Sequence, residues 1–308
     1  MSVVKFEGLG IIEEIVETHD RELAQAVSVI IPAYNEAAHV AGQIQAVREV
    51  MEQTGWRFEI IVVDDGSVDG TAARAVETGV RVLRHKKNRG YGASLKRGIA
   101  AASFDWILIT DADGTYPASA IPGLLERAAE NDMVVGARTG QTVKIPLVRR
   151  PAKWFLRRLA SYLAGQKLPD LNSGLRLMRK DLVDRYVHLL PSGFSFTTTI
   201  TLAAACNDHA LEYVRINYLA RLGESKIRPR HAYDFLILIL RTMVFFNPLK
   251  VFIPFGAFLA LAGLAKFGYD VVRDNLSESA VLALLGALIV WAVGLLADQN
   301  ARIAMNKR

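Results

Sequence analysis

The segment WILITDADGTY, residues 106–116, constrains the fold more than any other part of the chain. An uninterrupted apolar and β-branched run, residues 106–110, is followed by two carboxylates, Asp111 and Asp113, and by Gly114. Such a run predicts a strand buried on both faces, and ligands of parallel α/β sheets bind beyond the carboxyl ends of the strands. Hard divalent cations prefer carboxylate oxygens, so the pair indicates a metal site shared with a diphosphate. The alternative is a simple turn, because Asp-Gly is a common turn pair.

Two further apolar runs, residues 26–31 and 58–63, also end in polar clusters. These clusters are Tyr34-Asn35-Glu36 and Asp64-Asp65-Gly66-Ser67. We also expect a strand over residues 80–84 and helices ending near residue 53 and covering residues 72–78 and 93–102. This alternation predicts a mostly parallel, doubly wound α/β sheet with right-handed crossovers. Parallel strands point the same way, so the three acidic clusters should meet at one edge of the sheet.

The charge balance narrows the class of ligand. The formal net charge is +6, the pI is about 9.4, and basic residues gather in residues 81–97, 144–158 and 221–230. Basic clusters suit nucleic acid, anionic lipid or phosphate substrates. The sequence contains no nucleic-acid-binding motif, so we expect phosphates and a membrane surface as partners and no nucleic acid. The lone Cys206 excludes an internal disulfide and fits a reducing compartment.

The excess of apolar residues lies almost wholly after residue 235. Residues 249–269 and 280–297 are each about long enough to cross ~30 Å of hydrocarbon. Residues 233–247 are apolar but contain Asp234 and Arg241, which favours an interfacial helix. The alternative is a helical hairpin buried in a soluble protein, which the lengths disfavour.

Charge asymmetry gives an orientation for these predicted spans. The loop 270–279 is acidic apart from Arg273, whereas the region before residue 249 and the tail 300–308 are basic. Residues 1–25 carry several acids and no apolar core of a secretory signal. We therefore expect a cytoplasmic (inner) membrane protein with two spans, and with its α/β domain and both termini on the cytoplasmic side.

Four ordered motifs carry a family resemblance. They are PAYNEA at residues 32–37, VVDDGSVDGT at 62–71, NRGYGASLKRG at 88–98 and DADGTYP at 111–117. Together they resemble the inverting GT-A glycosyltransferases of family 2, whose fold is Rossmann-like. In that family the first two motifs hold the nucleotide of a nucleotide-sugar, and the DxD pair holds a divalent cation, Mg²⁺ or Mn²⁺, on its diphosphate.

The resemblance implies a set of donor-site residues in this chain. Asn35, Glu36 and Asp65 would contact the base and ribose, while Asp111 and Asp113 would be metal ligands, with Asp113 the better candidate. The full nucleotide-sugar-binding set is Pro32, Tyr34, Asn35, Glu36, Asp64, Asp65, Gly66, Lys87, Gly92, Asp111, Ala112 and Asp113. One departure is Gly114-Thr115, where the family often has Leu followed by Gln or Ser, so Thr115 would assist the metal less well.

The later motifs look like those of the polyprenyl-phosphate glycosyltransferases, which include dolichyl-phosphate mannose synthases and bacterial undecaprenyl-phosphate enzymes. They are MVVGAR at residues 133–138, DLNSGLR at 170–176, FSFTTT at 194–199 and RLGESK at 221–226. The resemblance implies a lipid-phosphate site formed by Arg138, Arg149, Lys153, Ser173, Arg176 and Lys226. A predicted basic helix over residues 152–163 carries Arg157 and Arg158, which could instead form a solvated or lipid-facing cationic face.

The expected reaction is inverting transfer of a single sugar, by a hexosyltransferase, from a UDP- or GDP-sugar to the phosphate of undecaprenyl or dolichyl phosphate. A phosphate monoester is largely a dianion at neutral pH, so it needs no strong general base. The candidate catalytic residues are Asp113, Arg138 and Asp170, although the Asp170 motif could equally cap a turn.

Two other functions remain open at this point. A processive polysaccharide synthase would share the first half of the chain, but its late QxxRW motif is absent. A non-catalytic membrane subunit that binds nucleotide-sugar or lipid would not need the intact DAD and RLGESK motifs.

The basic helix and the spans could also form a homo-oligomer. The predicted layout is a helical preface (1–25), a GT-A catalytic domain (26–230), juxtamembrane amphipathic helices (231–248), a two-helix transmembrane hairpin (249–299) and a basic cytoplasmic tail (300–308).

Overall fold

The computed structural model describes residues 25–139, 150–193, 195–218, 230–273 and 277–306. The chain forms two compact units. Unit 1 comprises Met1–Lys144, Asn172–Thr197 and Ala210–Glu224, and unit 2 comprises Ile145–Leu171, Thr198–His209 and Ser225–Arg308. The predicted helical preface lies outside the described residues except for Gln25.

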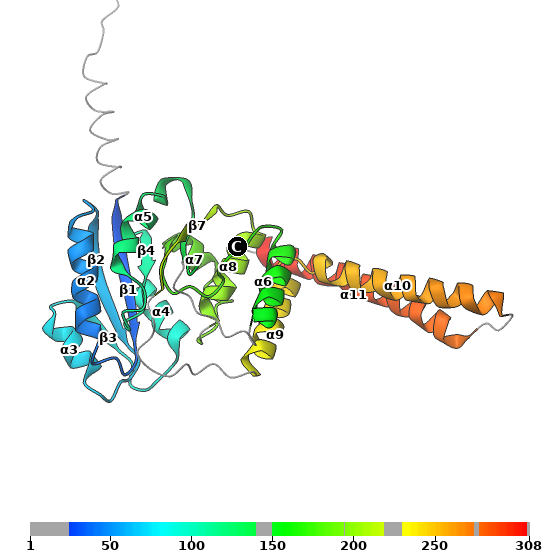
Figure 1. The fold of residues 1–308 in the computed structure, drawn as a ribbon, viewed down its shortest axis with the longest axis horizontal. Coiled ribbons are helices and arrows are strands. Elements are labelled where there is room, and N and C mark those ends of the chain that lie inside the picture. Colours follow the sequence, from blue (N-terminus) through cyan, green and yellow to red (C-terminus); the bar gives the residue numbers. More distant parts are fainter. Residues whose placement is uncertain (1–24, 140–149, 194, 219–229, 274–276, 307–308) are drawn as a thin grey trace, which may run out of the picture. The chain divides into compact units, whose positions relative to one another are not determined.

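Unit 1 is built on a seven-stranded sheet in the order β3-β2-β1-β4-β6-β5-β7 (Figure 1). The strands are β1 (Ala26–Ala33), β2 (Arg57–Asp64), β3 (Arg81–Arg84), β4 (Trp106–Ile109), β5 (Met133–Ala137), β6 (Arg176–Arg179) and β7 (Leu211–Arg215). Strands β1 to β4 are mutually parallel, and β5 is parallel to β7. Only β6 is reversed, because it pairs antiparallel with both β4 and β5. The sheet is therefore mixed but mostly parallel, as the alternation of apolar runs predicts.

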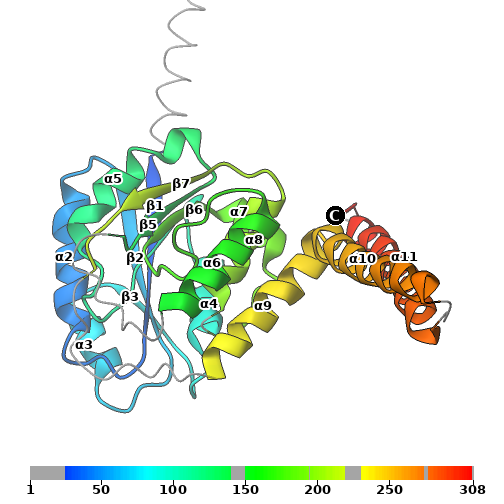
Figure 2. The same cartoon turned by 45° about the vertical axis from the view of Figure 1, so that its right-hand side comes forward.

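Helices cover both faces of this sheet. Val29 and Ile31 of β1 share a buried core with α2, whereas Ile30 on the other face meets α4 so closely that a Cβ at Gly98 would lie 2.5 Å from its Cγ2 atom. Figures 1 and 2 show α2 and α4 on opposite sides of β1. The helical elements of unit 1 are α2 (Val40–Glu52), α3 (Thr71–Glu77), α4 (Tyr91–Ala100), η1 (Ala118–Ala120), α5 (Ile121–Leu125), η2 (Ala128–Glu130) and α7 (Lys180–Tyr186).

Unit 2 is helical. It contains α6 (Arg150–Ala164), most of α8 (Phe196–Cys206), α9 (Arg230–Phe246), α10 (Leu249–Val272) and α11 (Glu278–Asn306). Helix α9 contacts α6, α10 and α11, and its Ile239 and Met243 are fully buried. Helix α6 is two-sided: Ala160 and Leu163 are buried, while Trp154, Phe155 and Tyr162 are more than half exposed.

Helices α10 and α11 pack against each other as a hairpin with close contacts at small residues. A Cβ at Gly256 would lie 2.3 Å from Nε1 of Trp291, whose indole N–H donates to the Ile253 carbonyl at 3.2 Å. At the loop end of α10, the Asp270 carboxylate accepts hydrogen bonds from the Ser277 backbone and from Lys266. The two helices are therefore joined along their length and at the turn.

Both hairpin helices have the length and composition of membrane spans. The candidate spans are Leu249–Val272 and Glu278–Ile303, with mean hydropathies of 1.8 and 2.6 and with only 11% and 17% of their windows buried. Large apolar side chains such as Phe258, Leu261 and Ile289 are more than 60% exposed. An apolar surface of this extent is unfavourable in water and indicates membrane association.

Candidate active site

The first two polar clusters meet at the carboxyl ends of β1 and β2, as the parallel order predicts. The Asn35 backbone N–H donates to Ser67 Oγ at 2.9 Å, and that of Glu36 donates to Thr71 Oγ1 at 2.9 Å. The Asn35 side chain in turn accepts from the Val68 N–H at 3.1 Å. Asn35 has a φ of 55°, a left-handed conformation that asparagine tolerates better than most residues. These bonds fix the predicted nucleotide-binding loops to each other.

Asp65 connects the end of β2 to the loop that leads into α4. Its Oδ1 accepts from the Arg89 N–H at 2.9 Å and lies 2.7 Å from Nδ1 of His85, while its Oδ2 accepts from the Gly90 N–H at 2.8 Å. Both Asp65 and His85 are about 4% exposed. The carboxylate therefore organises the donor loop in this structure, and its direct contact with a base or ribose stays a prediction.

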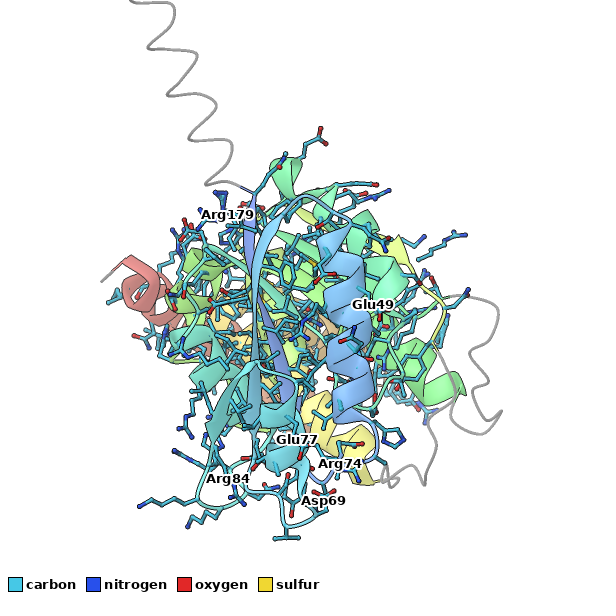
Figure 3. All side chains as sticks on the ribbon, turned by 90° about the vertical axis from the view of Figure 1, so that its left-hand side faces the viewer. Glu49, Asp69, Arg74, Glu77, Arg84 and Arg179 are labelled. Atoms are coloured by element: carbon cyan, nitrogen blue, oxygen red, sulfur yellow. The ribbon has the colours of Figure 1, made fainter. Side chains whose placement is uncertain are left out.

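The neighbouring residues of this loop differ in exposure. Asp64 is fully buried, and its Oδ2 lies 3.0 Å from Nε of Arg84. Figure 3 shows Arg84 and Asp69 at this end of the sheet and Arg179 near the opposite end. Pro32 is buried, whereas Tyr34, Asn35 and Lys87 are exposed and accessible to a nucleotide.

Asp111 and Asp113 follow β4 and are both partly exposed. Asp113 Oδ1 accepts from the backbone N–H of Thr115 at 3.1 Å and from its hydroxyl at 2.6 Å, and Thr115 is itself buried. Asp111 Oδ1 accepts from the Tyr91 hydroxyl, at the start of α4, at 2.9 Å. Burial and the adjacent Asp111 charge raise the pKa of Tyr91 well above its ordinary value, so the phenol stays a hydrogen-bond donor.

The turn before β6 packs directly against Asp111. A Cβ at Gly174 would lie 2.7 Å from Asp111 Oδ2, so this position accommodates only glycine without a shift. The Gly174 N–H donates to the Tyr116 hydroxyl at 2.6 Å, and Ser173 Oγ donates to the Gly136 carbonyl at 2.5 Å.

Arg176 lies at the start of β6 and is fully buried. Its guanidinium donates to the Ser173 carbonyl at 2.6 Å and to the Thr197 carbonyl at 3.1 Å. Ser173 is also fully buried. For these two predicted lipid-phosphate ligands the structure shows bonds to backbone carbonyls, which shape the turn, and direct phosphate binding stays a prediction.

Arg138 follows β5 and is held by aromatic side chains. Its guanidinium lies 5.4 Å from the Tyr218 ring centroid, and that ring packs edge-on against Tyr116 at 5.1 Å. Burial raises the pKa of Tyr116, Arg138 opposes the increase, and Asp111 adds to it. Tyr116 thus contacts the Tyr218 ring that lies under Arg138, and it also accepts from Gly174, which packs against Asp111.

The structure describes only some of the remaining predicted site residues. Arg149 and Lys226 lie outside the described residues, and Lys153 lies on α6 without a described side chain. Asp170 belongs to unit 2 and is partly exposed. Ala112 and Gly92 are buried, and a Cβ at Gly92 would lie 2.2 Å from the Pro191 carbonyl oxygen.

Three residues that contact the predicted site residues were not themselves predicted from sequence: Tyr91, Tyr116 and Gly174. Tyr91 lies between two glycines of NRGYG, and Tyr116 follows the DAD carboxylates, so each was visible as an aromatic residue within a motif. Their partners are distant in sequence, and nothing in a linear pattern identifies them. The hydroxyl of Thr115 donates directly to Asp113, and the expectation that Thr115 assists the metal less well stays a prediction.

The donor set fits a hard divalent cation. Within the described residues, no group of three or more His, Cys, Asp or Glu side chains could hold a metal. Asp111 and Asp113 offer carboxylate oxygens, and Mg²⁺ is commonly held by one or two carboxylates while substrate phosphates and water complete its shell. The protein thus supplies part of a metal site that a diphosphate would complete.

The fold is a mostly parallel α/β domain followed in the chain by an apolar helical hairpin, and the site offers carboxylates suited to a divalent cation. Residues 28–187 match the family described as Glycosyl transferase family 2, and residues 247–303 match the GtrB C-terminal hairpin. The chain belongs to glycosyl transferase family 2.

Curated relatives are similar over most of the chain. The undecaprenyl-phosphate 4-deoxy-4-formamido-L-arabinose transferase of Klebsiella pneumoniae (strain 342) is 29% identical over 87% of this chain and 82% of its own. The dolichol-phosphate mannosyltransferase of Pyrococcus furiosus is 30% identical over 85% and 76%. The bactoprenol glucosyl transferase of Shigella phage SfV is 28% identical over 92% and 95%.

Solved structures share the fold at lower identity. Glucosyl-3-phosphoglycerate synthase from Mycobacterium tuberculosis, in complex with Mn²⁺, UDP and phosphoglyceric acid, superposes with a TM-score of 0.57 at 22% identity over 75% of this chain and 81% of its own. Mannosyl-3-phosphoglycerate synthase from Rubrobacter xylanophilus gives a TM-score of 0.59 at 21% identity over 74% and 75%. The predicted family and its GT-A fold are confirmed.

Proposed function

We propose that this glycosyltransferase transfers one sugar from a nucleotide-sugar to the phosphate of a membrane polyprenyl phosphate, with inversion at the anomeric carbon. The main support for the proposal is that one chain contains both a family 2 glycosyltransferase domain and a GtrB-type C-terminal hairpin. The undecaprenyl-phosphate, dolichol-phosphate and bactoprenol transferases are similar to this chain across both parts.

The donor side rests on the loops that follow β1, β2 and β4. The exposed Tyr34 and Asn35 are candidates for contact with the nucleotide, and Asp65 holds the next loop in place. Asp111 and Asp113 would hold a divalent cation, Mg²⁺ or Mn²⁺, which neutralises charge on the donor diphosphate. The Mn²⁺ and UDP of the M. tuberculosis synthase support this choice.

The acceptor side requires cations more than a base. The lipid phosphate is largely a dianion at neutral pH and is itself the nucleophile. One of its oxygens forms a bond to the anomeric carbon, while the bond from that carbon to the diphosphate oxygen breaks and the nucleoside diphosphate leaves. Arg138, stacked over Tyr218, would hold the phosphate, with Arg149, Lys153 and Lys226 as further candidate ligands. Asp170 is the candidate carboxylate near the reacting carbon.

The helical unit would keep the enzyme at the bilayer where its acceptor resides. Helices α10 and α11 would span the membrane, and the exposed Trp154, Phe155 and Tyr162 of α6 suit the headgroup region. The basic residues before residue 249 and in the tail, against one arginine in the loop 270–279, support a topology with both termini and the catalytic domain in the cytoplasm.

The sugar class separates the relatives from one another. Their printed names include mannosyl and glucosyl transferases and a 4-deoxy-4-formamido-L-arabinose transferase. We propose a hexose for this chain. We further propose a homo-oligomer in the membrane, which light scattering in detergent would detect.

The test uses the full chain purified in detergent with undecaprenyl or dolichyl phosphate, a panel of UDP- and GDP-sugars, and Mg²⁺ or Mn²⁺. Nucleoside diphosphate release and glycolipid mass are followed for wild type, for Asp113→Asn and for Glu49→Gln. Glu49 is exposed on α2, away from the site, and serves as the matched carboxylate-to-amide control (Figure 3).

A single-sugar lipid phosphate that Asp113→Asn abolishes and Glu49→Gln preserves would support the proposal. Polymer formation would assign the chain to the processive synthases. Nucleotide-sugar binding without turnover for any donor would assign it to the non-catalytic subunits.

A further inference from the structure

Tyr91 joins two motifs that lie on different elements of unit 1. It is the first residue of α4, and its hydroxyl donates to Oδ1 of Asp111 beyond β4 at 2.9 Å. A hydrogen bond to a carboxylate is charge-assisted and stronger than one between neutral groups. The bond therefore restricts the direction in which Asp111 presents its oxygens.

Asp111 is confined from a second side by the turn before β6. Both of its carboxylate oxygens lie within 2.8 Å of the place that a Cβ on Gly174 would occupy. The Gly174 N–H is bonded to the Tyr116 hydroxyl, which fixes the turn. The Tyr91 hydroxyl is thus bonded to one carboxylate oxygen, and the Gly174 backbone packs close to both oxygens.

The backbone around Tyr91 is itself fixed. Both oxygens of Asp65 accept from the N–H groups of Arg89 and Gly90, and the Ala93 N–H donates to the Ser192 carbonyl at 3.0 Å. A Cβ at Gly90 would lie 2.6 Å from that same carbonyl oxygen. The start of α4 is thus packed against the chain on both sides, so the Tyr91 hydroxyl has a defined position.

We propose that Tyr91 is a positioning residue for the metal–diphosphate site, holding the Asp111 carboxylate in the orientation that the cation requires. The inference rests on the proposed function, because it takes Asp111 and Asp113 as the carboxylates that face the cation. Partners that orient ligands in this way commonly contribute about 10-fold to 100-fold to metal affinity. Tyr91 would not touch the substrate and would act through Asp111 alone.

The experiment measures Mn²⁺ affinity in the presence of UDP and, separately, of GDP by electron paramagnetic resonance of free Mn²⁺. It uses the full chain in detergent, as wild type and as Tyr91→Phe. The same change at a buried tyrosine of α7, Tyr186→Phe, is the control. We expect Tyr91→Phe to weaken Mn²⁺ binding about 10-fold. We expect Tyr186→Phe to leave Mn²⁺ affinity within about 2-fold. Helix α7 begins beside the amino end of β4, whereas Asp111 follows the carboxyl end of that strand, and distant sites usually act independently.

A double-mutant cycle with Asp111→Asn tests whether the effect passes through the carboxylate. In the Asp111→Asn background, Tyr91→Phe should change Mn²⁺ affinity less than 2-fold, since the acceptor charge is gone. Gly174→Ala provides a second test, because its Cβ would displace the Asp111 carboxylate while the tyrosine hydroxyl stays intact. It should also weaken Mn²⁺ binding about 10-fold.

Each outcome decides a distinct point. Unchanged Mn²⁺ affinity in Tyr91→Phe, or an equal loss with and without the Asp111 carboxylate, overturns the inference and leaves the proposed function standing. A lower melting temperature with normal Mn²⁺ affinity shows a purely structural tyrosine and also overturns it. A wild-type chain that binds no Mn²⁺ with either UDP or GDP overturns the proposed function itself.

Discussion

Single glycines decide how closely the motifs of this site approach one another. A Cβ at Gly92 would lie 2.2 Å from the Pro191 carbonyl oxygen, and one at Gly66 would lie 2.8 Å from the Lys87 carbonyl carbon. Gly66 also has a φ of 77°, which favours glycine. These residues are needed for close backbone contact between loops that are distant in sequence. Glycine in motifs of this kind therefore has a packing role as well as a conformational one.

Gly92→Ala should destabilise unit 1 by about 1–3 kcal/mol, the usual cost of overpacking, since the Pro191 carbonyl is backbone and cannot move aside easily. Thermal unfolding followed by circular dichroism measures the loss. Gly42→Ala on α2 is the matched control: nothing lies within 4 Å of its Cβ, so better helix propensity should make it neutral or stabilising. Equal melting temperatures for the two variants would contradict the packing argument.

Cys206 should be unreactive in the folded protein. Burial raises the pKa of its thiol to about 11, and Lys250 only partly opposes this. At pH 8 about one thiol in a thousand would be ionised, against about a quarter at the ordinary cysteine pKa. We therefore expect alkylation by iodoacetamide at least about 100-fold slower in the native state than in denaturant. Comparable rates in both states would show that α8 opens readily.

At the scale of elements, the long apolar and amphipathic segments could be predicted from sequence and the short polar strands could not. The strands β1 to β5 and the helix α10 lie within a few residues of their predicted positions, whereas α11 begins near its predicted start at residue 280 but continues to Asn306, beyond the predicted end at residue 297. Strand β6, with the sequence RLMR, and β7, with LEYVR, carry no clear alternation, and tertiary pairing alone makes them strands. Helix α8 begins with FTTTI, whose β-branched residues disfavour a helix, so its packing overrides propensity.

The same limit applies to the site. The carboxylates after β2 and β4 follow from the pattern of apolar runs, since parallel strands deliver their ends to one edge. The burial of Arg176 does not follow from the sequence, because arginine is usually exposed. The structure shows its guanidinium bonded to the backbone carbonyls of Ser173 and Thr197, and its contact with a lipid phosphate stays a prediction.

The hairpin offers an element-scale prediction. Gly256→Ala should loosen α10 from α11, because the new Cβ would lie 2.3 Å from the Trp291 indole nitrogen and disturb its bond to Ile253. We expect a destabilisation of about 1–3 kcal/mol, seen as a lower melting temperature in detergent. Gly268→Ala, with nothing within 4 Å of its Cβ, is the control on the same helix. A Gly256→Ala variant as stable as this control would show that the hairpin repacks at no cost.

At the scale of the whole molecule, the chain forms one unit built on the β-sheet and one helical unit. Unit 1 contains Asp65, Asp111 and Asp113 of the proposed donor site, and unit 2 contains both candidate spans. The two units are interleaved in sequence, since unit 2 receives residues 145–171 and 198–209 from within the catalytic region. A cut near residue 230 would therefore not separate them cleanly.

The proposed membrane orientation makes a prediction at this scale. In a Cys206→Ser background, Glu278→Cys at the loop end of α11 should react with a membrane-impermeant maleimide in intact cells. Arg302→Cys, which is 70% exposed by side chain near the other end of α11, should react only after permeabilisation. The reverse pattern would place the basic tail outside and refute the charge-based orientation.

The reversed direction of β6 limits which insertions and deletions this protein can accept during evolution. The turn at residues 172–174 leads directly into β6, so an inserted residue there would slip the strand by one position and exchange its two faces. Arg176 would leave its buried carbonyl partners, and Gly174 would no longer face Asp111. Insertions and deletions should therefore be rare between Asn172 and Arg176 among descendants that keep the activity, even though the segment reads as an ordinary loop.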